Sequence, residues 1–513
     1  MIKQKSNKKV IYDGFGNIFS VQIVKHLQDT YDWEPVFMCG IQNQIIEKYL
    51  SENEMGCVLQ DSMKLRQAQF DYSRIGKPVP IDSAVINALS NYVVNFLGVL
   101  HDKSGWDYSF EERKSFYYDI LMYWNTVITN MKPDIAIFFS WPHTSSCYPL
   151  YLLCKHWFNI ETLFIDPNPL FDRNYHYVGT SLEKLHSPFI DIYESNDVIT
   201  PGDDVKNYLS KVRGDNAIIP KYITDGYIRD KKTKRKLYYN FILLLLSTCK
   251  NGGGFKKAFF EYKKNKKNYA SLASRMNRFE ALFFGAGVRR KNIRLIGCYN
   301  KFCIEPNCNK KYLYFASSYQ PEANTATNAG AYEQLFLALD ILSASVPEDW
   351  VIYYKEHPAT FLEGFKGSLK RNKMFYEKVA SYNNIKIISA DEDTFKLITN
   401  SQAVSTVAGT IGWEAVVRNT PVLAFGSTWY QGCKSVFTIS SLNDAKQAIK
   451  KISEGYLPDA NDIERYAASV EKVAVKGIIH DNFHQEISRS NNPEYEMKRI
   501  ADFLYDGYNQ NYG

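Results

Sequence analysis

The strongest constraint on the fold is a series of short apolar stretches that alternate with segments of helical length. In the second half of the chain, strand-like stretches lie at 312–316, 350–354, 385–389, 403–407 and 421–425, and segments with helical periodicity lie between them at 329–344, 394–399 and 411–418. Strands that alternate with helix-length segments are typical of βαβ units, so this half predicts a parallel sheet with helices on its faces.

The first half shows the same alternation, with strand-like stretches at 10–12, 34–39, 135–139 and 161–165 and helical segments at 18–27 and 148–158. We therefore expect an α/β protein with two Rossmann-like, doubly wound domains that face a central cleft, where ligands bind at the carboxyl ends of the strands. The predicted divisions are an N-terminal domain at 1–224, a basic helical insert or linker at 225–300, a C-terminal domain at 301–480 and a helical tail at 481–513.

The insert carries most of the uneven charge of the chain. Twelve Lys or Arg side chains lie between 231 and 267, opposed only by Glu261. Such a segment is either a solvated helical hairpin whose apolar face packs on the protein, or an interfacial segment attracted to anionic lipid. The net charge of +7 is mild for 513 residues; it favours anionic partners in general and does not indicate nucleic acid.

Other sequence features predict a cytoplasmic protein. The nine cysteines are scattered without CxxC pairs or histidines at zinc-finger spacing, as expected of reduced thiols. The N-terminus has no apolar core of a signal peptide, and the longest apolar run, 241–246, is too short to span a bilayer. If the basic insert binds lipid, we expect peripheral attachment to the inner face of the cytoplasmic membrane. We expect no bound metal, since no DxD stretch follows a predicted strand.

The loop after strand 312–316 is dense in polar groups and includes Gln320 and Glu322. Glu322 is its only carboxylate, and a carboxylate held at a cleft can act as a general base or a nucleophile. The alternative is a capping loop that leads into the helical segment at 329.

The next strand ends in Lys355, Glu356, His357 and Pro358. Lys355 and His357 can both donate to phosphate oxygens, and Pro358 restricts His357 to extended geometry, which fixes the direction of the imidazole. Strand alternation predicts that Glu356 points away from them. The alternative is an exposed Lys–Glu pair and a histidine that caps a turn.

A third loop follows strand 403–407. The hydroxyls of Ser405, Thr406 and Thr410, together with Gly409 and the start of a helix, make a ready anion site, and Glu414 can accept the two hydroxyls of a ribose. A capped helix is an adequate alternative for any one residue. Because all three loops leave the same edge of one sheet, together they predict a site for a nucleotide-activated sugar.

In the first half, the stretch Asp13-Gly14-Phe15-Gly16-Asn17 follows the first strand. Its two glycines let the backbone approach a substrate or phosphate closely. The stretch lacks the third glycine of a dinucleotide fingerprint, and a tight turn is the alternative.

Four of these motifs, in their order, resemble the bacterial capsule polysaccharide biosynthesis family, which includes the Kdo transferases that build the lipid-proximal linker of capsules. They are Gln320-Pro321-Glu322, Lys355-Glu356-His357-Pro358, Ser405 to Ala415, and Pro421 to Gly426. The resemblance covers about residues 310–430 and is looser over 1–200, where it rests on Ser140-Trp141-Pro142-His143 and the order of strands and helices.

The resemblance implies a GT-B glycosyltransferase that holds the donor nucleotide on its C-terminal domain and the acceptor on its N-terminal domain. It assigns His357 and Lys355 to the donor phosphate, with Gln320 also on the donor side. Ser405, Thr406, Gly409 and Thr410 would contact phosphate or nucleotide, and Glu414 the ribose.

The acceptor side would include Asp13, Gly14, Gly16, Asn17 and His143. One departure affects the chemistry of the donor side. Where β-Kdo transferases of the family carry acidic residues just after the Gln-x-Glu, this chain has Ala323 and Asn324. An asparagine cannot be a carboxylate nucleophile, so Glu322 is the candidate general base or nucleophile, with His357 as its catalytic partner.

The function implied is transfer of a sugar, by analogy a CMP-activated ulosonic acid, to a glycan or lipid-linked acceptor in capsule or lipopolysaccharide synthesis. The nucleotide sugar is a substrate, and no cofactor is expected. Three alternatives remain open at this point: a non-hydrolysing UDP-sugar epimerase, a polyol-phosphate transferase of the teichoic-acid type, and a non-catalytic scaffold of capsule assembly.

Overall fold

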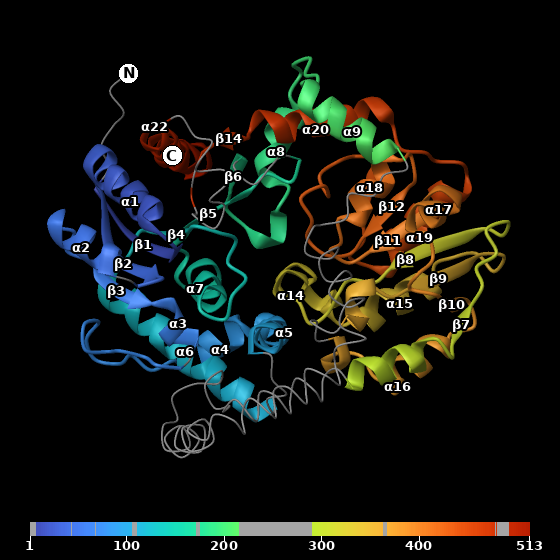
Figure 1. The fold of residues 1–513 in the computed structure, drawn as a ribbon, viewed down its shortest axis with the longest axis horizontal. Coiled ribbons are helices and arrows are strands. Elements are labelled where there is room, and N and C mark those ends of the chain that lie inside the picture. The colour runs from blue at the N-terminus through green and yellow to red at the C-terminus, as the bar shows by residue number, and fades with distance from the viewer. Residues whose placement is uncertain are drawn as a thin grey trace, which may run out of the picture.

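The computed structural model describes residues 7–42, 44–66, 68–104, 110–170, 175–214, 290–362, 367–477, 479 and 492–512. These residues form two lobes, each built on a seven-stranded sheet with helices packed on its faces (Figure 1). The predicted α/β class with two doubly wound domains is confirmed. Of the insert predicted at 225–300, only residues 290–300 are described. The basic segment 231–267 lies entirely outside the described residues.

The first sheet has the strand order β14-β6-β5-β4-β1-β2-β3. Its strands are β1 (Lys8–Phe15), β2 (Trp33–Gly40), β3 (Val58–Asp61), β4 (Ile135–Phe138), β5 (Glu161–Pro167), β6 (Tyr175–Gly179) and β14 (Val475–Lys476). Strands β5, β4, β1, β2 and β3 run parallel, whereas β6 and β14 add an antiparallel edge. The four predicted strands of this lobe are confirmed within longer observed strands or to within one residue.

The helices in the first half of the chain are α1 (Ile18–Tyr31), α2 (Gln44–Glu52), α3 (Ser62–Arg66), α4 (Ser83–Ala88), α5 (Val93–Ser104), α6 (Phe110–Met131), α7 (Cys147–Leu153), α8 (Ser187–Glu194) and α9 (Asp203–Arg213). Short 3-10 segments lie at Ser90–Tyr92 and Leu182–Lys184, and a π-helical segment lies at Cys154–Phe158. Helix α1 begins at Asn17 because the Asn17 side chain accepts from the Ser20 N–H while the Ser20 hydroxyl accepts from the Asn17 N–H, a reciprocal cap.

The second sheet is parallel throughout, in the order β13-β12-β11-β8-β9-β10-β7. Its strands are β7 (Cys303–Ile304), β8 (Tyr312–Ala316), β9 (Val351–Lys355), β10 (Ile385–Ile388), β11 (Ala403–Thr406), β12 (Val422–Ala424) and β13 (Val436–Thr438). Alternate residues of β8 enter two different cores: Tyr312 and Tyr314 join one cluster, whereas Leu313 and Phe315 join the other. A strand buried on both faces reads as a continuous apolar run, which is why the sequence predicted these strands well.

The helices of the second lobe and the C-terminal region are α14 (Ala323–Asn328), α15 (Leu335–Ser343), α16 (Lys373–Ala380), α17 (Thr394–Asn400), α18 (Ile411–Val417), α19 (Leu442–Ser453), α20 (Ala460–Lys472) and α22 (Pro493–Tyr512). Short 3-10 segments lie at Gly330–Glu333, Pro358–Phe361 and Gly367–Leu369. The single helix predicted at 329–344 is broken, because Gly330 has a φ of +54° and Gln334 is extended, so only α15 forms a regular helix.

The end of the chain returns to the first lobe (Figure 1). Strand β14 pairs with β6, and α22 packs on α1, where the rings of Tyr505 and Tyr31 stack with centroids 3.8 Å apart. The chain therefore leaves the second lobe before residue 480, the boundary expected from the sequence. The predicted helical tail contains α22, and this helix covers one face of the first sheet.

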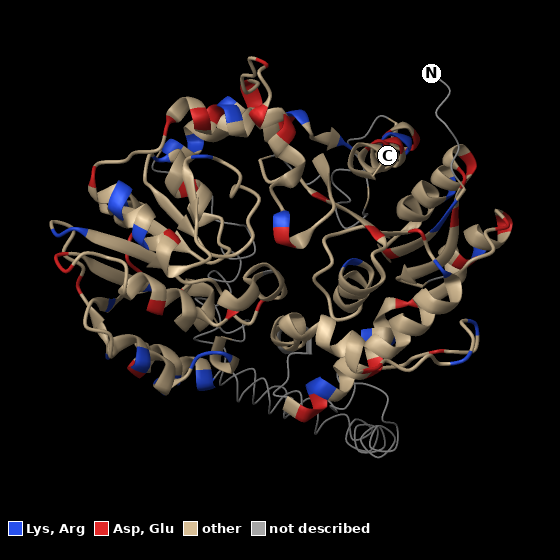
Figure 2. Ribbon diagram, turned by 180° about the vertical axis from the view of Figure 1, so that it is seen from behind, with Lys and Arg blue, Asp and Glu red and all other residues tan. Residues whose placement is uncertain are grey.

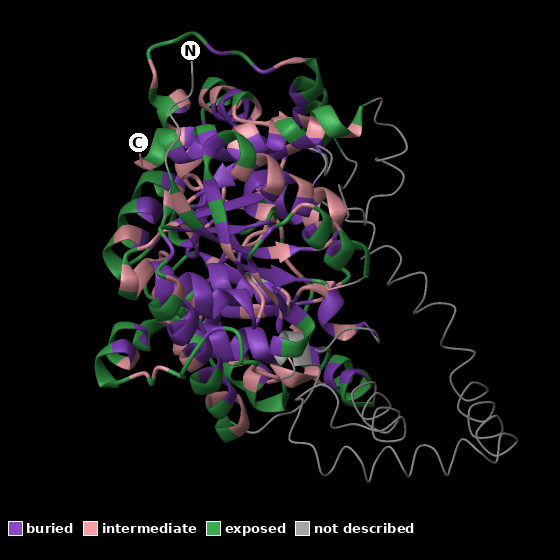
Figure 3. Ribbon diagram, turned by 90° about the vertical axis from the view of Figure 1, so that its left-hand side faces the viewer, coloured by how far each residue is buried: buried purple, intermediate pink, exposed green. Residues whose placement is uncertain are grey.

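The buried residues run through the middle of both lobes (Figure 3). One hydrophobic cluster includes side chains of both sheets, for example Phe138 of β4 and Tyr314 of β8, so the two lobes share a core where they meet. Lys and Arg are interspersed with Asp and Glu around the outer helices (Figure 2). Among the described helices, none combines the length and the apolar character needed to cross a membrane.

Candidate functional site

The three polar loops predicted from the sequence leave one edge of the second sheet. Strands β11, β8 and β9 are neighbours, and in their register Ala316 lies beside Lys355 while Phe315 lies beside Ser405. The carboxyl ends of these strands are therefore adjacent, as predicted.

This edge of the second sheet lies against the first lobe. The Asn95 side chain of α5 donates from Nδ2 to the carbonyl oxygens of Ala326 and Gly330, at 2.7 and 2.8 Å. A second link joins the Leu185 N–H to the Ser427 hydroxyl, at 3.4 Å. The loops that follow β8 and β12 thus meet the acceptor-side lobe of the predicted arrangement.

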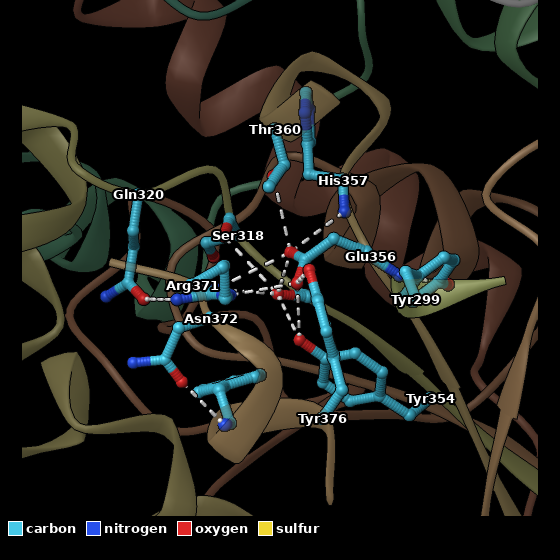
Figure 4. Close-up of polar contacts among 12 residues, drawn as sticks. Tyr299, Ser318, Gln320, Tyr354, Glu356, His357, Thr360, Arg371, Asn372 and Tyr376 are labelled. Atoms are coloured by element: carbon cyan, nitrogen blue, oxygen red, sulfur yellow. Dashed lines mark hydrogen bonds and ion pairs between the residues drawn. The ribbon is translucent and has the colours of Figure 1, made fainter. Parts of the chain in front are cut away.

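Glu356 is the centre of a buried polar network in this edge (Figure 4). Its Oε2 lies 2.8 Å from Arg371 Nε, and both side chains are at most 2% exposed. The hydroxyls of Ser317, Tyr354 and Tyr376 donate to the same carboxylate at 2.9, 2.9 and 3.1 Å. Burial opposes ionisation, but the guanidinium and these donors outweigh it and hold the pKa of Glu356 below its ordinary value.

Strand alternation predicted that Glu356 points away from Lys355 and His357, without specifying what lies on that side. Glu356 does lie on the opposite side of the backbone from Lys355, as strand alternation requires, but that side is the interior of the lobe. The same network extends to Gln320, whose Oε1 accepts from Arg371 Nη1 at 2.9 Å and whose Nε2 donates to the Glu333 carbonyl at 2.8 Å.

Lys355 does not extend toward the predicted phosphate position. It is 4% exposed, and its Nζ donates to the Glu392 carbonyl and to the Thr394 hydroxyl, both at 2.6 Å. Burial lowers the pKa of Lys355 to about 8, opposed by the nearby acidic groups of the β10–α17 loop. The Lys355 ammonium group is thus held at the start of α17, whereas the resemblance had assigned it to the donor phosphate.

His357 stands at the start of the 3-10 segment Pro358–Phe361 and caps it. Its Nδ1 accepts from the Ala359 N–H at 3.1 Å, and its own N–H donates to Glu356 Oε1 at 3.2 Å. Burial lowers the pKa of His357 to about 4, with Lys355 lowering it further and Glu356 opposing. At neutral pH the imidazole is therefore uncharged, and its remaining ring nitrogen, Nε2, carries the hydrogen.

Glu322 immediately precedes α14, at the boundary between the lobes, and its side chain makes no capping hydrogen bond to that helix. Its Oε2 accepts from the Thr325 hydroxyl at 2.8 Å, and its side chain is half-buried. Ala323 begins α14 and is buried. Through the contact of α14 with Asn95, this carboxylate is held close to both lobes.

The hydroxyls predicted to bind an anion after β11 divide into two groups. Ser405 and Thr406 are fully buried, and their hydroxyls donate to the carbonyls of Leu423 and Ala316, at 3.2 and 3.3 Å. These two hydroxyls thus join neighbouring strands, whereas the resemblance had assigned them to phosphate or nucleotide. Thr410 is exposed, and its side chain makes no capping hydrogen bond to α18.

Gly409 is constrained by close packing. Its N–H donates to the Thr406 hydroxyl at 3.2 Å, and a Cβ at this position would lie 2.8 Å from that oxygen. Glu414, one turn into α18, is half-buried; burial raises its pKa, and Arg418 opposes the rise. After burial, the charge of Glu414 is also a cause of the raised pKa of the Tyr208 hydroxyl on α9.

In the first lobe, Asp13 lies beside Cys39 of β2 and Phe138 of β4 in the sheet register. The carboxyl group is 5% exposed, and its Oδ1 has no hydrogen-bond partner among the described residues. Burial raises the pKa of Asp13 to about 6, while the Cys39 thiol and the Arg66 guanidinium oppose the rise. A buried carboxyl oxygen without a partner is costly, and at a strand end it points to a function.

The residues that follow Asp13 have roles in the turn and at the start of α1. Gly14 has a φ of +86°, which favours glycine, and the Gly16 N–H donates to the Ser20 hydroxyl at 3.3 Å. Asn17 caps α1 and donates from Nδ2 to the Ile479 carbonyl at 3.2 Å. His143 lies on the loop after β4, with Nδ1 2.6 Å from the Trp141 carbonyl oxygen.

Sequence reasoning missed three charged residues of these edges. Arg371 has no periodic or motif signal, because it follows a 3-10 turn fifteen residues after its partner Glu356. Asp166 ends β5 and has a pKa raised by burial to about 7. Arg66 ends α3 and donates to the Ser146 hydroxyl at 3.3 Å. Asp166 could have been recognised from the sequence, because it directly follows the apolar strand predicted at 161–165.

Comparison with solved structures gives three examples of similar chains. The UDP-GlcNAc 2-epimerase of Methanocaldococcus jannaschii, in complex with UDP-GlcNAc and UDP, is 14% identical with a TM-score of 0.26, over 91% of this chain and 99% of that one. The β-Kdo 2,7 transferase of Thermosulfurimonas dismutans KpsC is 10% identical with a TM-score of 0.25, over 86% and 90%. The β-Kdo 2,4 transferase of the same protein is 16% identical with a TM-score of 0.22, over 36% and 54%.

Among curated proteins, none matches the sequence. A family model does match, over the part of the chain that contains β8, β9, β11 and the loops described above. The matched residues run from 304 to 499, and the model is that of the capsule polysaccharide biosynthesis protein. This match over residues 304–499 confirms the resemblance inferred from the motifs.

Proposed function

We propose that this protein is a glycosyltransferase of capsule or lipopolysaccharide synthesis. It transfers a sugar from a nucleotide donor, specifically a CMP-activated ulosonic acid, to a glycan or lipid-linked acceptor. The observation that carries the proposal is the meeting of Gln320, Glu322 and His357 on one sheet edge that lies against the first lobe, within the residues that match the family.

His357 would contact the leaving phosphate as a neutral donor. Because Nδ1 accepts from the Ala359 N–H, the Nε2–H is the group available to a phosphate oxygen. Ser318 lies beside the same network (Figure 4); it is buried, and its hydroxyl has no hydrogen-bond partner among the described residues. Fixed neutral donors of this kind stabilise charge that develops in the transition state.

The nucleotide itself would lie across the loop from Gly409 to Ile411. Thr410 is exposed at the start of α18, and Glu414, one turn into that helix, would accept the ribose hydroxyls. Lys355, Ser405 and Thr406 would support these loops from beneath and would not touch the donor.

The transfer breaks the bond from the anomeric carbon to the phosphate oxygen, and the electron pair leaves with the nucleotide. A new bond forms from the acceptor hydroxyl oxygen to that carbon, and the hydroxyl proton passes to a carboxylate. Two carboxylates are suited to this role: Glu322 at the start of α14, and Asp13, whose Oδ1 has no hydrogen-bond partner within the described part of the chain. On the acceptor side, Gly14, Gly16, Asn17 and His143 would shape the loop around Asp13.

The test compares wild-type protein with H357A, using radiolabelled CMP-, UDP- and GDP-sugars and a membrane extract as the source of acceptor. We expect transfer from a CMP-sugar, and a loss of at least about tenfold in H357A, equivalent to about 1.4 kcal/mol in the barrier. Absence of transfer from every donor, or full activity of H357A, would refute the proposal.

The same materials separate the alternatives. A UDP-sugar epimerase would convert UDP-GlcNAc without any acceptor, and a polyol-phosphate transferase would consume CDP-glycerol. A scaffold protein would remain folded and bind none of these nucleotides in a calorimeter.

Attachment to an anionic membrane through residues 231–267 is a separate part of the proposal. It rests on the charge of that segment in the sequence, since the segment lies outside the described residues. Deletion of 231–267 should release the protein from vesicles that contain anionic lipid; unchanged co-sedimentation would refute membrane attachment.

A further inference from the structure

The buried carboxylate of Glu356 collects donors from four separate segments of the second lobe. Ser317 follows β8, Tyr354 belongs to β9, Thr360 lies in the 3-10 segment after it, and Arg371 and Tyr376 flank the start of α16. Figure 4 shows these side chains converging on one carboxylate. A buried ion pair is weak evidence for stability, because apolar residues of similar volume often serve as well.

The ion pair of Glu356 and Arg371 makes direct hydrogen bonds to two residues of the candidate site. Glu356 Oε1 accepts from the His357 N–H at 3.2 Å, and from the Thr360 hydroxyl at 3.4 Å on the far side of the turn. Arg371 Nη1 donates to Gln320 Oε1 at 2.9 Å. One end of the ion pair therefore holds the turn that carries His357, and the other end holds the loop that carries Gln320 and Glu322.

Arg371 uses all three of its nitrogens in this task. Nε donates to Glu356 Oε2 at 2.8 Å, Nη1 donates to Gln320, and Nη2 donates to the Ser317 hydroxyl at 3.3 Å. The ring of Phe375 lies 4.4 Å beneath the guanidinium carbon, which fixes the plane of the fork. A lysine has a single nitrogen and could not make these three contacts together.

We propose that Glu356 and Arg371 are positioning residues that set the distance between the His357 turn and the Gln320–Glu322 loop. The inference rests on the proposed transfer reaction, in which these two loops act on the leaving phosphate and on the acceptor. The pair touches neither substrate; it acts by preorganising the groups that do.

The central test is R371K, which keeps the positive charge beside Glu356 but removes the fork. We expect kcat to fall by at least about tenfold while the KM for the nucleotide sugar changes by less than about threefold, as expected for a loss confined to the transition state. The matched control is R465K. Arg465 also uses three nitrogens, on the carbonyls of Tyr193, Ser195 and Asp197, but lies on α20 away from these loops. R465K should keep wild-type kcat.

A double-mutant cycle with H357A distinguishes positioning from general loss of structure. If Arg371 acts through His357, R371K in the H357A background should lower kcat/KM by less than about twofold. An undiminished effect of R371K in that background would overturn the inference, as would wild-type kcat in R371K. If R371K does not fold, S317A replaces it; this variant keeps the ion pair and should lower kcat by about threefold with the same KM.

A crystal structure of R371K or S317A decides the inference without any assay of transfer. We expect the His357 imidazole or the Gln320 amide to shift from its wild-type position; superimposable side chains would overturn the inference. A wild-type protein that transfers no sugar would refute the proposed function alone, and the crystallographic comparison would still decide whether the pair positions the two loops.

Discussion

His357 Nδ1 accepts a hydrogen bond from the Ala359 N–H at 3.1 Å, so the imidazole is held as the tautomer with hydrogen on Nε2. The pKa of His357 is lowered to about 4 by burial, which keeps this tautomer uncharged at neutral pH. The imidazole at the end of β9 is therefore a fixed neutral donor.

The first prediction concerns the pH dependence of transfer. Because His357 stays neutral, kcat should show no limb due to its protonation between about pH 6 and about pH 8. The measurement is a pH–rate profile of wild-type protein beside H357Q, which keeps a side-chain donor. A limb near the ordinary histidine pKa that disappears in H357Q would show that the charged imidazole takes part.

The lowered pKa of His357 also makes the stability of the fold depend on pH. The folded-state pKa of about 4 lies below the ordinary value of 6.5, so within that window the unfolded chain binds more protons at His357 than the folded chain does. The contribution of neutral His357 to the free energy of unfolding is present above pH 6.5 and is lost as the pH falls toward 4. In urea unfolding, H357Q should have a shallower loss of stability across this window than wild type.

The second prediction concerns Lys355. Its Nζ donates to the Glu392 carbonyl and the Thr394 hydroxyl, so K355M should leave the affinity for CMP within about twofold of wild type, measured by calorimetry. The folded-state pKa of about 8 lies below the ordinary 10.5, so stability should rise as the pH goes from 8 to 10.5, and K355M should lack this rise. A loss of CMP affinity of about tenfold or more in K355M would instead place the ammonium group on the phosphate.

The contrast between Lys355 and Glu356 shows how far the sequence could predict the site. The strand β9 and its place beside β8 and β11 follow from short apolar runs, since strands buried on both faces leave a continuous signal. Strand alternation also correctly separates the two side chains. What the sequence could not show is which side is interior, because that depends on Arg371 and Tyr376, which come from a turn and a helix later in the chain.

Tertiary contacts also decide the role of the hydroxyls at the end of β11. Ser405 and Thr406 look like an anion site because they precede a glycine and a helix. In the sheet, however, their hydroxyls satisfy carbonyls of the adjacent strands β12 and β8, a pairing that only the tertiary structure fixes. Similarly, β14 and α22 return to the first lobe, and no local pattern at 475–512 specifies which lobe they cover.

The third prediction concerns Asp13, whose pKa of about 6 lies above the ordinary 3.8 because the group is buried. The folded chain holds the proton more tightly than the unfolded chain between these values, so the contribution of Asp13 to stability is lost as the pH rises from 3.8 to 6. D13N should therefore raise the free energy of unfolding above pH 6, by about 1–3 kcal/mol at 1.36 kcal/mol per pKa unit, and not below pH 3.8.

The activity of D13N should change in the opposite direction. If the unpartnered Oδ1 takes the acceptor proton, D13N loses at least about tenfold in kcat while becoming more stable, the trade-off expected of a buried functional charge. Thermal melts and transfer assays on one preparation measure both effects. A stabilised D13N with full activity would assign the proton to Glu322 alone, which E322Q then tests.

The fourth prediction concerns the contact between the lobes at Asn95. Its Nδ2 donates to the carbonyls of Ala326 and Gly330. These two hydrogen bonds hold α14, and therefore Glu322, against the first lobe. N95A leaves both carbonyls without this donor and should lower the free energy of unfolding by about 1–3 kcal/mol. Because α14 is no longer held in place, kcat should also fall, by about threefold to tenfold.

The control for Asn95 is Asn125, a residue of α6 that is buried to a similar degree. Its side chain donates to the carbonyls of Val79 and Pro80, at 3.1 and 3.4 Å, and both of these partners lie within the first lobe. N125A should lose a comparable amount of stability and keep wild-type kcat, measured at a temperature where both variants are folded. Equal kcat in N95A and N125A would show that the position of α14 does not limit the reaction. A loss of kcat in N95A alone would show that the hydrogen bonds between α5 and α14 hold Glu322 where the acceptor is activated.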